Sequence, residues 1–219
     1  MKRVLIAPID TLLFEEVMTF VRGASRSRYD YIGNFYRKED QYNSALAYVL
    51  LCLATEKLVG EIKIGANGKP YLEEMNCHIS ISHTNKLVSI GISNENIGID
   101  CEMESNINDV IVNEVFSISE KTQVMKNDFL KVVFWTAKEA ISKLYNEDWY
   151  SSPSTELIYN ANGELKDAVS SEVYLHQYSF RKGCICVASV SPDQPSFQLV
   201  TEKEISEFLD NFAKFFSKN

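Results

Sequence analysis

The chain has 219 residues, which suits one large domain or two small ones, and its hydrophobic content of 45% is sufficient for a substantial core. It carries 22 basic and 30 acidic residues, a formal net charge of −8, which argues against a general nucleic-acid-binding surface because such a surface needs a basic face. The negative net charge does not exclude a small basic pocket that binds a nucleotide.

The cysteines and the short hydrophobic runs predict a cytoplasmic protein. The five cysteines include no Cys-x-x-Cys pair and the three histidines lack metal-binding spacing, so we expect reduced thiols. The first hydrophobic run ends at Pro8, too early for a signal peptide, and the uncharged run 45–54 is too short to span a bilayer. We therefore expect no nucleic-acid or membrane partner.

The chain begins with a predicted strand and two predicted helices. Residues 4–7 are typical of a short buried strand, and hydrophobic residues at helical spacing predict helices over 13–23 and 42–53. Between the helices lie the densest basic spots of this acidic chain, Arg-Ser-Arg at 26–28 and Arg-Lys at 37–38. These spots are equally typical of a solvated loop and of an anion-binding site.

A turn at Lys69 and Pro70 precedes a predicted β-hairpin. Pro70 fixes its own φ and pushes Lys69 toward extended geometry, so Lys69 is either a rigid edge for a ring or phosphate or an ordinary surface lysine. Alternating runs over 77–82 and 87–93 predict the hairpin. Its tip, Ser82-His83-Thr84, offers groups that suit phosphate oxygens or that simply satisfy the turn itself.

Asp100 and Glu102 end the next predicted strand, which starts at about Ile97. Residues two apart in a strand point to the same face, so the two carboxylates lie side by side. Two negative charges at such a short distance repel each other unless a cation lies between them. A site with only oxygen ligands suits Mg²⁺. An acidic strand end in solvent is the simpler interpretation, and a metal site needs a third ligand and a phosphate site elsewhere.

A boundary near Ser105 opens a second half that begins with helices. Residues 107–115 predict a short amphipathic helix. Ser117 and Glu120 then match a capping box, so Glu120 has a structural explanation with which any role as a base or ligand would have to coexist.

The next helix, which we expect Asp128 to cap, carries another candidate carboxylate. Glu139 lies opposite the hydrophobic stripe of this helix, yet Val132 and Trp135 share its side, which suggests that this side is also covered. The alternative is a surface pair between Glu139 and Lys143, four residues apart.

The rest of the chain predicts strands and a final helix. The helix opens with a capping box at Thr201 and Glu204, and its hydrophobic stripe runs to Phe216. The strands are expected at 157–159, 172–180 and 184–190.

Five short motifs follow one another in the region of about residues 28–145. They are Gly68-Lys69-Pro70-Tyr71, the segment 79–84 (ISISHT), the segment 98–102 (GIDCE), the segment 116–120 (FSISE) and the segment 134–143 (FWTAKEAISK). In order and rough spacing this set resembles the 4′-phosphopantetheinyl transferases, specifically their longer single-chain Sfp-type class.

The resemblance implies an α+β fold with α/β sandwich-like halves. Two similar subdomains, 1–104 and 105–219, would be related by a pseudo-twofold axis, with the active site between them in a monomer. It implies an enzyme that transfers the 4′-phosphopantetheine of coenzyme A to a serine of an acyl or peptidyl carrier protein and releases 3′,5′-ADP. The implied metal is Mg²⁺, with Mn²⁺ as an alternative.

The resemblance also implies roles for particular residues of this chain. Metal ligands would be Asp100, Glu102 and Glu139. Contacts with coenzyme A would come from Arg28, Lys69, Pro70, Ser82, His83, Asp100, Lys138 and Lys143. Catalytic roles would fall to Glu120, Glu139 and Lys143, with Glu120 as the base for the serine or as a further metal-side carboxylate.

The chain departs from the family pattern near the expected 3′-phosphate contacts. Tyr31 occupies a commonly basic position, and the segment 40–43 lacks the arginine that usually follows the matching aspartate. A hydrophobic patch around 116–129 is the candidate docking surface for an acidic carrier. Two other hypotheses are Mg²⁺-dependent phosphotransfer on another nucleotide and a non-catalytic carrier-binding module, although a binding module has no need for the carboxylates.

Overall fold

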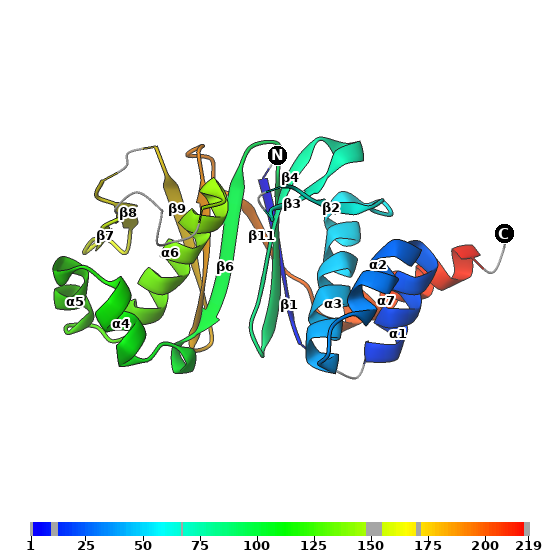
Figure 1. Cartoon of the computed structure of the whole chain (residues 1–219), viewed down its shortest axis with the longest axis horizontal. Helices are drawn as coiled ribbons and strands as arrows, with labels where there is room; N and C mark the ends of the chain where they lie inside the picture. The colour runs from blue at the N-terminus through cyan, green and yellow to red at the C-terminus, as the bar shows by residue number, and fades with distance from the viewer. Residues whose placement is uncertain (1, 10–12, 67, 148–154, 170–171, 217–219) are drawn as a thin grey trace.

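The computed structural model describes residues 2–9, 13–66, 68–147, 155–169 and 172–216, which form a mixed α+β fold and confirm the expected class. Across the long axis of the molecule the layers are helices, sheet, sheet and helices (Figure 1). In the described part of the chain, no helix combines the length and hydrophobicity needed to cross a membrane.

The larger sheet has six strands in the order β11-β1-β5-β4-β3-β2. β1 and β11 are parallel, and the other neighbours are antiparallel. The strands are β1 (Lys2–Pro8), β2 (Ile62–Ile64), β3 (Pro70–Leu72), β4 (Cys77–His83), β5 (Leu87–Ser93) and β11 (Ser196–Leu199).

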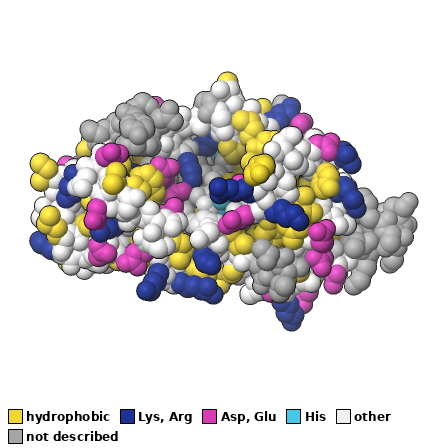
Figure 2. Space-filling model, turned by 60° about the horizontal axis from the view of Figure 1, so that its bottom comes forward, with side chains coloured by type: hydrophobic (Ala, Val, Ile, Leu, Met, Phe, Trp, Pro, Cys, Tyr) yellow, Lys and Arg dark blue, Asp and Glu magenta, His cyan; other side chains and the backbone are white. Residues whose placement is uncertain are grey.

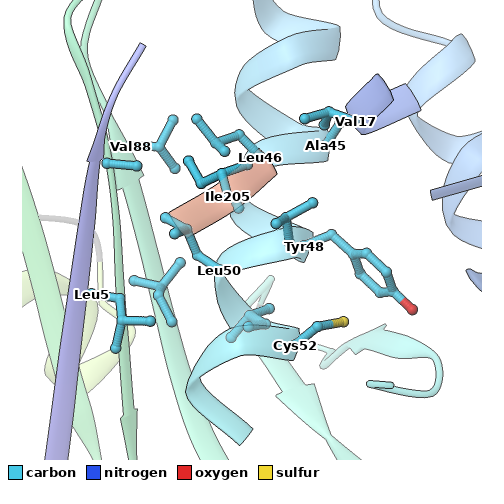
Figure 3. Packing of buried hydrophobic residues seen from close by; sticks show 14 of the residues in the cluster. Leu5, Val17, Ala45, Leu46, Tyr48, Leu50, Cys52, Val88 and Ile205 are labelled. Carbon is cyan, nitrogen blue, oxygen red and sulfur yellow. The ribbon is translucent and has the colours of Figure 1, made fainter. Parts of the chain in front are cut away.

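Four helices cover the outer face of this sheet (Figure 1). Leu46 and Leu50 of the longest helix are fully buried, and they point toward Leu5 and Val88 on the sheet (Figure 3). Burial of such side chains removes hydrophobic surface from water and is the main favourable term in folding. The helices are α1 (Phe14–Ala24), α2 (Arg26–Gly33), α3 (Lys38–Thr55) and α7 (Glu202–Phe216).

The second unit is a three-stranded antiparallel sheet in the order β6-β10-β9, beside a small hairpin of β7 and β8. Helix α6 packs on the outer face of the three-stranded sheet, and α4 and α5 lie beyond it (Figure 1). The elements are β6 (Ile97–Met103), α4 (Asp109–Val115), α5 (Ile118–Val124), α6 (Leu130–Tyr145), β7 (Leu157–Tyr159), β8 (Leu165–Asp167), β9 (Tyr174–Phe180) and β10 (Gly183–Ser189), with short 3₁₀ turns at Glu73–Met75 and Glu104–Asn106.

The two larger sheets face each other across a hydrophobic layer. Every other residue of β6 and β10 points into this layer, as the two-residue period of a strand requires. Its buried members are Val4, Ile6, Leu87, Ile97, Ile99, Cys101, Ile185 and Val187.

The layers exchange segments across the expected boundary at residues 104 and 105. β6 precedes that boundary, yet it forms its sheet with β10. β11 and α7 follow it, yet β11 pairs with β1, and Ile205 of α7 joins the core around α3.

Most predicted elements are confirmed, including the first strand and helix, the hairpin of β4 and β5, and the capping boxes at Glu120 and Glu204. The expectation that Asp128 caps the long helix is wrong. α6 begins at Leu130, its N-cap residue is Phe129 without a side-chain cap, and Asp128 instead forms an ion pair with Lys131 at 2.8 Å. The final helix is confirmed, but the side chain of Phe216 lies outside the described part.

Helix α2 was not predicted as a helix. It starts directly after Ser25, whose hydroxyl accepts a hydrogen bond from the backbone N–H of Arg28 and so caps the first turn. A serine cap therefore places Arg28 on a helix instead of in a solvated loop.

β6 and α6 approach each other at Gly98 more closely than any side chain would allow. A Cβ atom at Gly98 would lie 1.9 Å from the carbonyl oxygen of Ala140 and 2.6 Å from the backbone nitrogen of Leu144. Both neighbours are backbone atoms of a helix, and unlike the end of a flexible side chain they cannot move away without shifting the helix. Because Ala140 and Leu144 directly follow Glu139 and Lys143, this approach sets how near those two side chains come to β6.

We expect Gly98→Ala to destabilise the protein by about 3 kcal/mol or more, because the added methyl group forces α6 away from β6. Gly33→Ala is the matched control, since a Cβ there meets nothing within 4 Å. Urea denaturation measures both free energies of unfolding. Equal stability of the two variants would contradict the close approach.

Candidate functional site

The site is built where β6 faces α6. Asp100 and Glu102 follow Gly98 on the same face of β6, and Glu139 and Lys143 lie one helical turn apart on α6. The four side chains come from segments some forty residues apart, and the Gly98 contact brings those segments together. The predicted neighbourhood of these residues is therefore present.

Asp100 is buried, and one of its carboxylate oxygens accepts two hydrogen bonds. Its Oδ1 accepts from the hydroxyl of Ser82 at 2.7 Å and from the ammonium group of Lys143 at 2.7 Å. Lys143 also donates to Ser82 Oγ at 3.2 Å. The lysine thus supplies the positive charge that a buried carboxylate needs.

Serines of β4 hold the free edge of β6 in place. The backbone N–H of Ile99 donates to Ser80 Oγ at 3.0 Å, and that of Cys101 donates to Ser82 Oγ at 3.3 Å. Among the described strands, β6 has a partner only on its other side, so these hydroxyls satisfy groups that would otherwise be unpaired. They also fix the backbone on both sides of Asp100.

Glu102 is held at the end of β6. Its Oε1 accepts from the backbone N–H of Met103 at 2.7 Å and from the amide of Asn106 at 2.7 Å. These local bonds keep the carboxylate on the α6 side of the strand.

Glu139 is the unusual member of the group. Burial, together with the charges of Asp100 and Glu102, raises the pKa of this carboxyl group, and Lys143 opposes the shift. Glu139 has no hydrogen-bond or ion-pair partner among the described residues. It is a half-buried acceptor that faces two further carboxylates.

The three carboxylates fit a hard divalent cation by their donor chemistry, because Mg²⁺ prefers oxygen ligands and the unpartnered Glu139 would gain a positive charge. They are not gathered into a ready-made site, since no cluster of three or more His, Cys, Asp or Glu side chains within the described ranges could hold a metal ion as it stands. Lys143 lies against Asp100, where such a cation would bind. Metal binding would therefore require Lys143 to move.

A cavity of about 290 Å³ lies along α3 and β4, and its wall combines hydrophobic side chains with a few polar ones. The four side chains of the cluster do not line it, but His83 follows Ser82, the partner of Asp100. Its lining includes Arg28, Asp40, Asn43, Pro70 and His83. Figure 2 shows a central hollow with basic, acidic and histidine side chains around it. The predicted nucleotide contacts at Arg28, Pro70 and His83 therefore share one cavity.

Arg28 enters the cavity with part of its hydrogen-bonding capacity unused. Its guanidinium group donates to Ser44 Oγ at 2.8 Å and lies over the ring of Tyr31, 4.8 Å from the ring centre. Within the described part of the chain, its buried Nε has no hydrogen-bond partner, and neither has the buried Oδ1 of Asn43. Buried polar atoms are normally satisfied, so both atoms are available to water or to a polar ligand in this cavity.

His83 lines the cavity, and Lys69 reaches the end of α6. Burial lowers the pKa of His83, against the opposing charge of Asp40, so the ring is neutral at pH 7. Its Nδ1 lies 3.3 Å from the side-chain amide of Asn43. Lys69 donates to the carbonyl oxygen of Leu144 at the end of α6 at 3.2 Å, and burial lowers its pKa.

Glu120 and Lys138 lie outside the cluster and pair with each other. The carboxylate of Glu120 is fully buried and lies 2.9 Å from the ammonium group of Lys138. Its oxygens also accept from the backbone N–H groups of Ser117 and Leu157 at 2.7 and 2.8 Å. These contacts favour the helix-cap interpretation of Glu120, and they turn Lys138 away from the position expected along a pyrophosphate.

Sequence reasoning gave no role to Ser44, the partner of Arg28, or to Ser80, which holds β6. A signal for Ser44 was present, because residues 40, 43, 44 and 47 follow helical spacing and all four line the cavity. Ser80 alternates with Ser82 on the face of β4 opposite Ile79, which the predicted hairpin already implied.

Comparison with protein-family models finds no match, and comparison with curated protein sequences finds no significant relative.

We expect Glu120→Ala to lower the free energy of unfolding by about 3–5 kcal/mol, because the change leaves Lys138 buried without its partner. The control is the exposed pair of Lys203 and Glu207. Glu207→Ala should change the free energy of unfolding by less than about 0.5 kcal/mol. Urea denaturation measures both variants. An unchanged stability for Glu120→Ala would contradict the structural role.

The raised pKa of Glu139 predicts a pH-dependent effect of Glu139→Gln. Below the ordinary glutamate pKa of about 4.3 the group is protonated in both folded and unfolded states, so the variant should match the parent protein. As pH rises, the fold opposes ionisation and the parent loses stability. At pH 7 without metal, Glu139→Gln should therefore have the higher melting temperature.

Thermal melts between pH 4 and pH 8 test this expectation, with Glu114→Gln on the exposed surface of α4 as the control. A gain at pH 7 that shrinks toward pH 4 is expected only for Glu139→Gln. A lower melting temperature at pH 7 would mean that the carboxylate is stabilising as it stands.

Proposed function

We propose that this protein is a transferase that moves the 4′-phosphopantetheine group of coenzyme A to a serine hydroxyl of an acyl or peptidyl carrier protein. The proposal rests mainly on one observation. Asp100 and Glu102 on β6 face Glu139 and Lys143 on α6, and the cavity that Arg28 lines is close by. Coenzyme A has a pyrophosphate, which would lie at the carboxylates and Lys143, and an adenine nucleotide, which would occupy the cavity.

Asp100, Glu102 and Glu139 would hold Mg²⁺, or Mn²⁺ in its place, and the ion would supply positive charge to the pyrophosphate oxygens. Lys143 can serve the same phosphates, because a lysine ammonium is a mobile point charge on a flexible stem. Its contact with Asp100 would be exchanged for a phosphate contact when the nucleotide binds. Ser82 and His83, at the end of β4, offer hydrogen bonds to the phosphates from the opposite side.

In the transfer, the serine oxygen forms a bond to the β-phosphorus of coenzyme A and the bond to 3′,5′-ADP breaks. The hydroxyl proton must pass to a carboxylate, because a neutral hydroxyl is a weak nucleophile. Glu139 is the better candidate for this base than Glu120, since Glu139 faces the cluster and Glu120 is enclosed by Lys138 and two backbone N–H groups.

Two further features belong to the proposal. Each half has one long helix, α3 or α6, packed on a sheet, which is consistent with two similar subdomains about a pseudo-twofold axis and with a monomer. Ile118 and Met125 of the second half are 85% and 87% exposed, so they offer a hydrophobic surface on which an acidic carrier could dock in spite of the enzyme's own negative charge.

The test is a transfer assay with coenzyme A, Mg²⁺ and a panel of apo carrier proteins, read by mass spectrometry of the intact carriers. We expect one carrier to gain a single phosphopantetheine group. Asp100→Ala or EDTA should abolish the gain, and Asp109→Ala, on the exposed end of α4, should not. Coenzyme A binding without transfer to any carrier would contradict the proposal.

Arg28 should bind the 3′-phosphate of coenzyme A. We expect Arg28→Met to raise the KM for coenzyme A by about tenfold or more with little change in kcat, because a charge-assisted contact made equally in the ground and transition states is lost. Arg26→Met is the control, since Arg26 pairs with Asp30 on the surface of the same helix.

The same pair of variants can be measured with 3′-dephospho-coenzyme A. The parent protein should prefer the 3′-phosphorylated form, and Arg28→Met should lose most of that preference. A preference that survives in Arg28→Met would place the 3′-phosphate elsewhere.

A further inference from the structure

The two larger sheets end, on one side of the molecule, in a basic surface to which the proposed transfer chemistry gives no role. Lys86 lies in the turn between β4 and β5, and Arg181 and Lys182 form the turn between β9 and β10. All three residues are exposed. Together they are called the basic end face.

Hydrogen bonds and strand register place both turns at the same end of the molecule. The backbone N–H of Cys101 on β6 donates to Ser82 near the end of β4. Two residues later on β6, Met103 pairs with Gly183 at the start of β10. The turn after β4 and the turn before β10 therefore both lie where β6 ends (Figure 1). Because Glu102 belongs to the same part of β6, the basic end face borders the carboxylate cluster.

The positive charge of this face is not neutralised by ion pairs within the described ranges. Glu104 contacts the β9–β10 turn only through its backbone N–H, which donates to the carbonyl oxygen of Lys182 at 2.8 Å. Asp109, a little further along the chain, is already paired with Lys131 at 3.1 Å. Figure 2, in which this end is turned forward, shows basic side chains below the central hollow. The face is thus a local positive region on an acidic protein.

Arg181 has a backbone conformation that arginine rarely adopts. Its φ is +53°, in the left-handed region that glycine and asparagine favour. Its guanidinium group lies over the ring of Phe180, 5.4 Å from the ring centre, which keeps the charge at the surface of the turn. Local structure alone would favour glycine here, and an unfavourable backbone conformation of this kind is typical of functional positions.

The charge distribution selects a globular acidic protein as the partner. The whole chain has a net charge of −8, so it repels an extended polyanion such as a nucleic acid wherever that polyanion runs beyond the three basic residues. A compact acidic patch on a folded partner meets the basic end face alone. Complementary charges of this kind steer two proteins together and fix their orientation.

We propose that the basic end face binds an acidic surface of the acceptor carrier protein and so holds its serine beside the carboxylate cluster. The identity of the partner rests on the transfer reaction proposed above, whereas the charge and position of the face do not. The exposed hydrophobic side chains of Ile118 and Met125 supply hydrophobic contact, and the basic end face supplies the charge that orients the carrier.

The probes are an acyl carrier protein and a peptidyl carrier protein, each labelled with fluorescein and each with alanine in place of the acceptor serine. Binding to the full chain is then read by fluorescence anisotropy without any transfer. We expect saturable binding of at least one probe. Binding should weaken between about 0.05 M and about 0.5 M salt, because salt screens contacts between exposed charges.

A charge-reversed pair of residues tests the position of the contact. The double variant Arg181→Glu, Lys182→Glu should bind the carrier about tenfold more weakly or worse. The control is Arg22→Glu, Lys57→Glu, which changes the net charge equally at exposed positions of the helical layer. Lys57 follows α3, whose last turn contacts Arg3 at the opposite end of β1. The control should bind within about twofold of the parent protein.

Arg181→Gly separates binding from stability. Glycine adopts a positive φ without strain, so the variant should melt no earlier than the parent protein and yet bind the carrier about threefold more weakly. Equal weakening by the control variant, or displacement of the carrier by a single-stranded DNA of about 12 nucleotides, would overturn the proposal.

The same assay distinguishes this proposal from the transfer reaction itself. Carrier binding and transfer that the Arg181→Glu, Lys182→Glu variant leaves unchanged would overturn the docking role of the basic end face alone. A parent protein that binds neither carrier would overturn the docking role and contradict the proposed transfer as well.

Discussion

The backbone contact between β6 and α6 at Gly98 is the constraint on which the candidate site depends. Any side chain there would meet the carbonyl oxygen of Ala140, so glycine alone lets the helix lie directly on the strand. Asp100 and Glu102 lie on the strand beside this contact, and Glu139 and Lys143 lie on the facing side of the helix. One missing methyl group thus brings four charged side chains from two distant segments into one region.

This arrangement concentrates negative charge, and the fold compensates for it only in part. Asp100 is neutralised by Lys143 and held by Ser82, whereas Glu139 is half-buried, has no partner among the residues that the structure describes, and has a raised pKa. The protein therefore holds an electrostatic strain that a bound cation would relieve. Such unfavourable groupings are typical of functional sites, and the stability of the surrounding layers must offset them.

The sequence predicted the parts of the site that depend on local periodicity, and it left out those that depend on tertiary packing. The alternation of β4 and β6 placed Ser82 and Asp100 correctly, and Trp135 indicated that the Glu139 face is covered. The pairing of Glu120 with Lys138 was not predictable, because it joins α5, α6 and β7 through contacts between distant segments. For the same reason the crossing of β11 and α7 to the first layer had no signal in the pattern.

We propose that the carboxylates on β6 and α6 and the Arg28 cavity together form one site for coenzyme A and a divalent cation. A crystal structure with coenzyme A and Mn²⁺, recorded at a wavelength where manganese scatters anomalously, tests it most directly. We expect one anomalous peak among Asp100, Glu102 and Glu139, the nucleotide beside Arg28, and Lys143 displaced from Asp100. A peak away from these carboxylates, or a nucleotide bound elsewhere, would contradict the account.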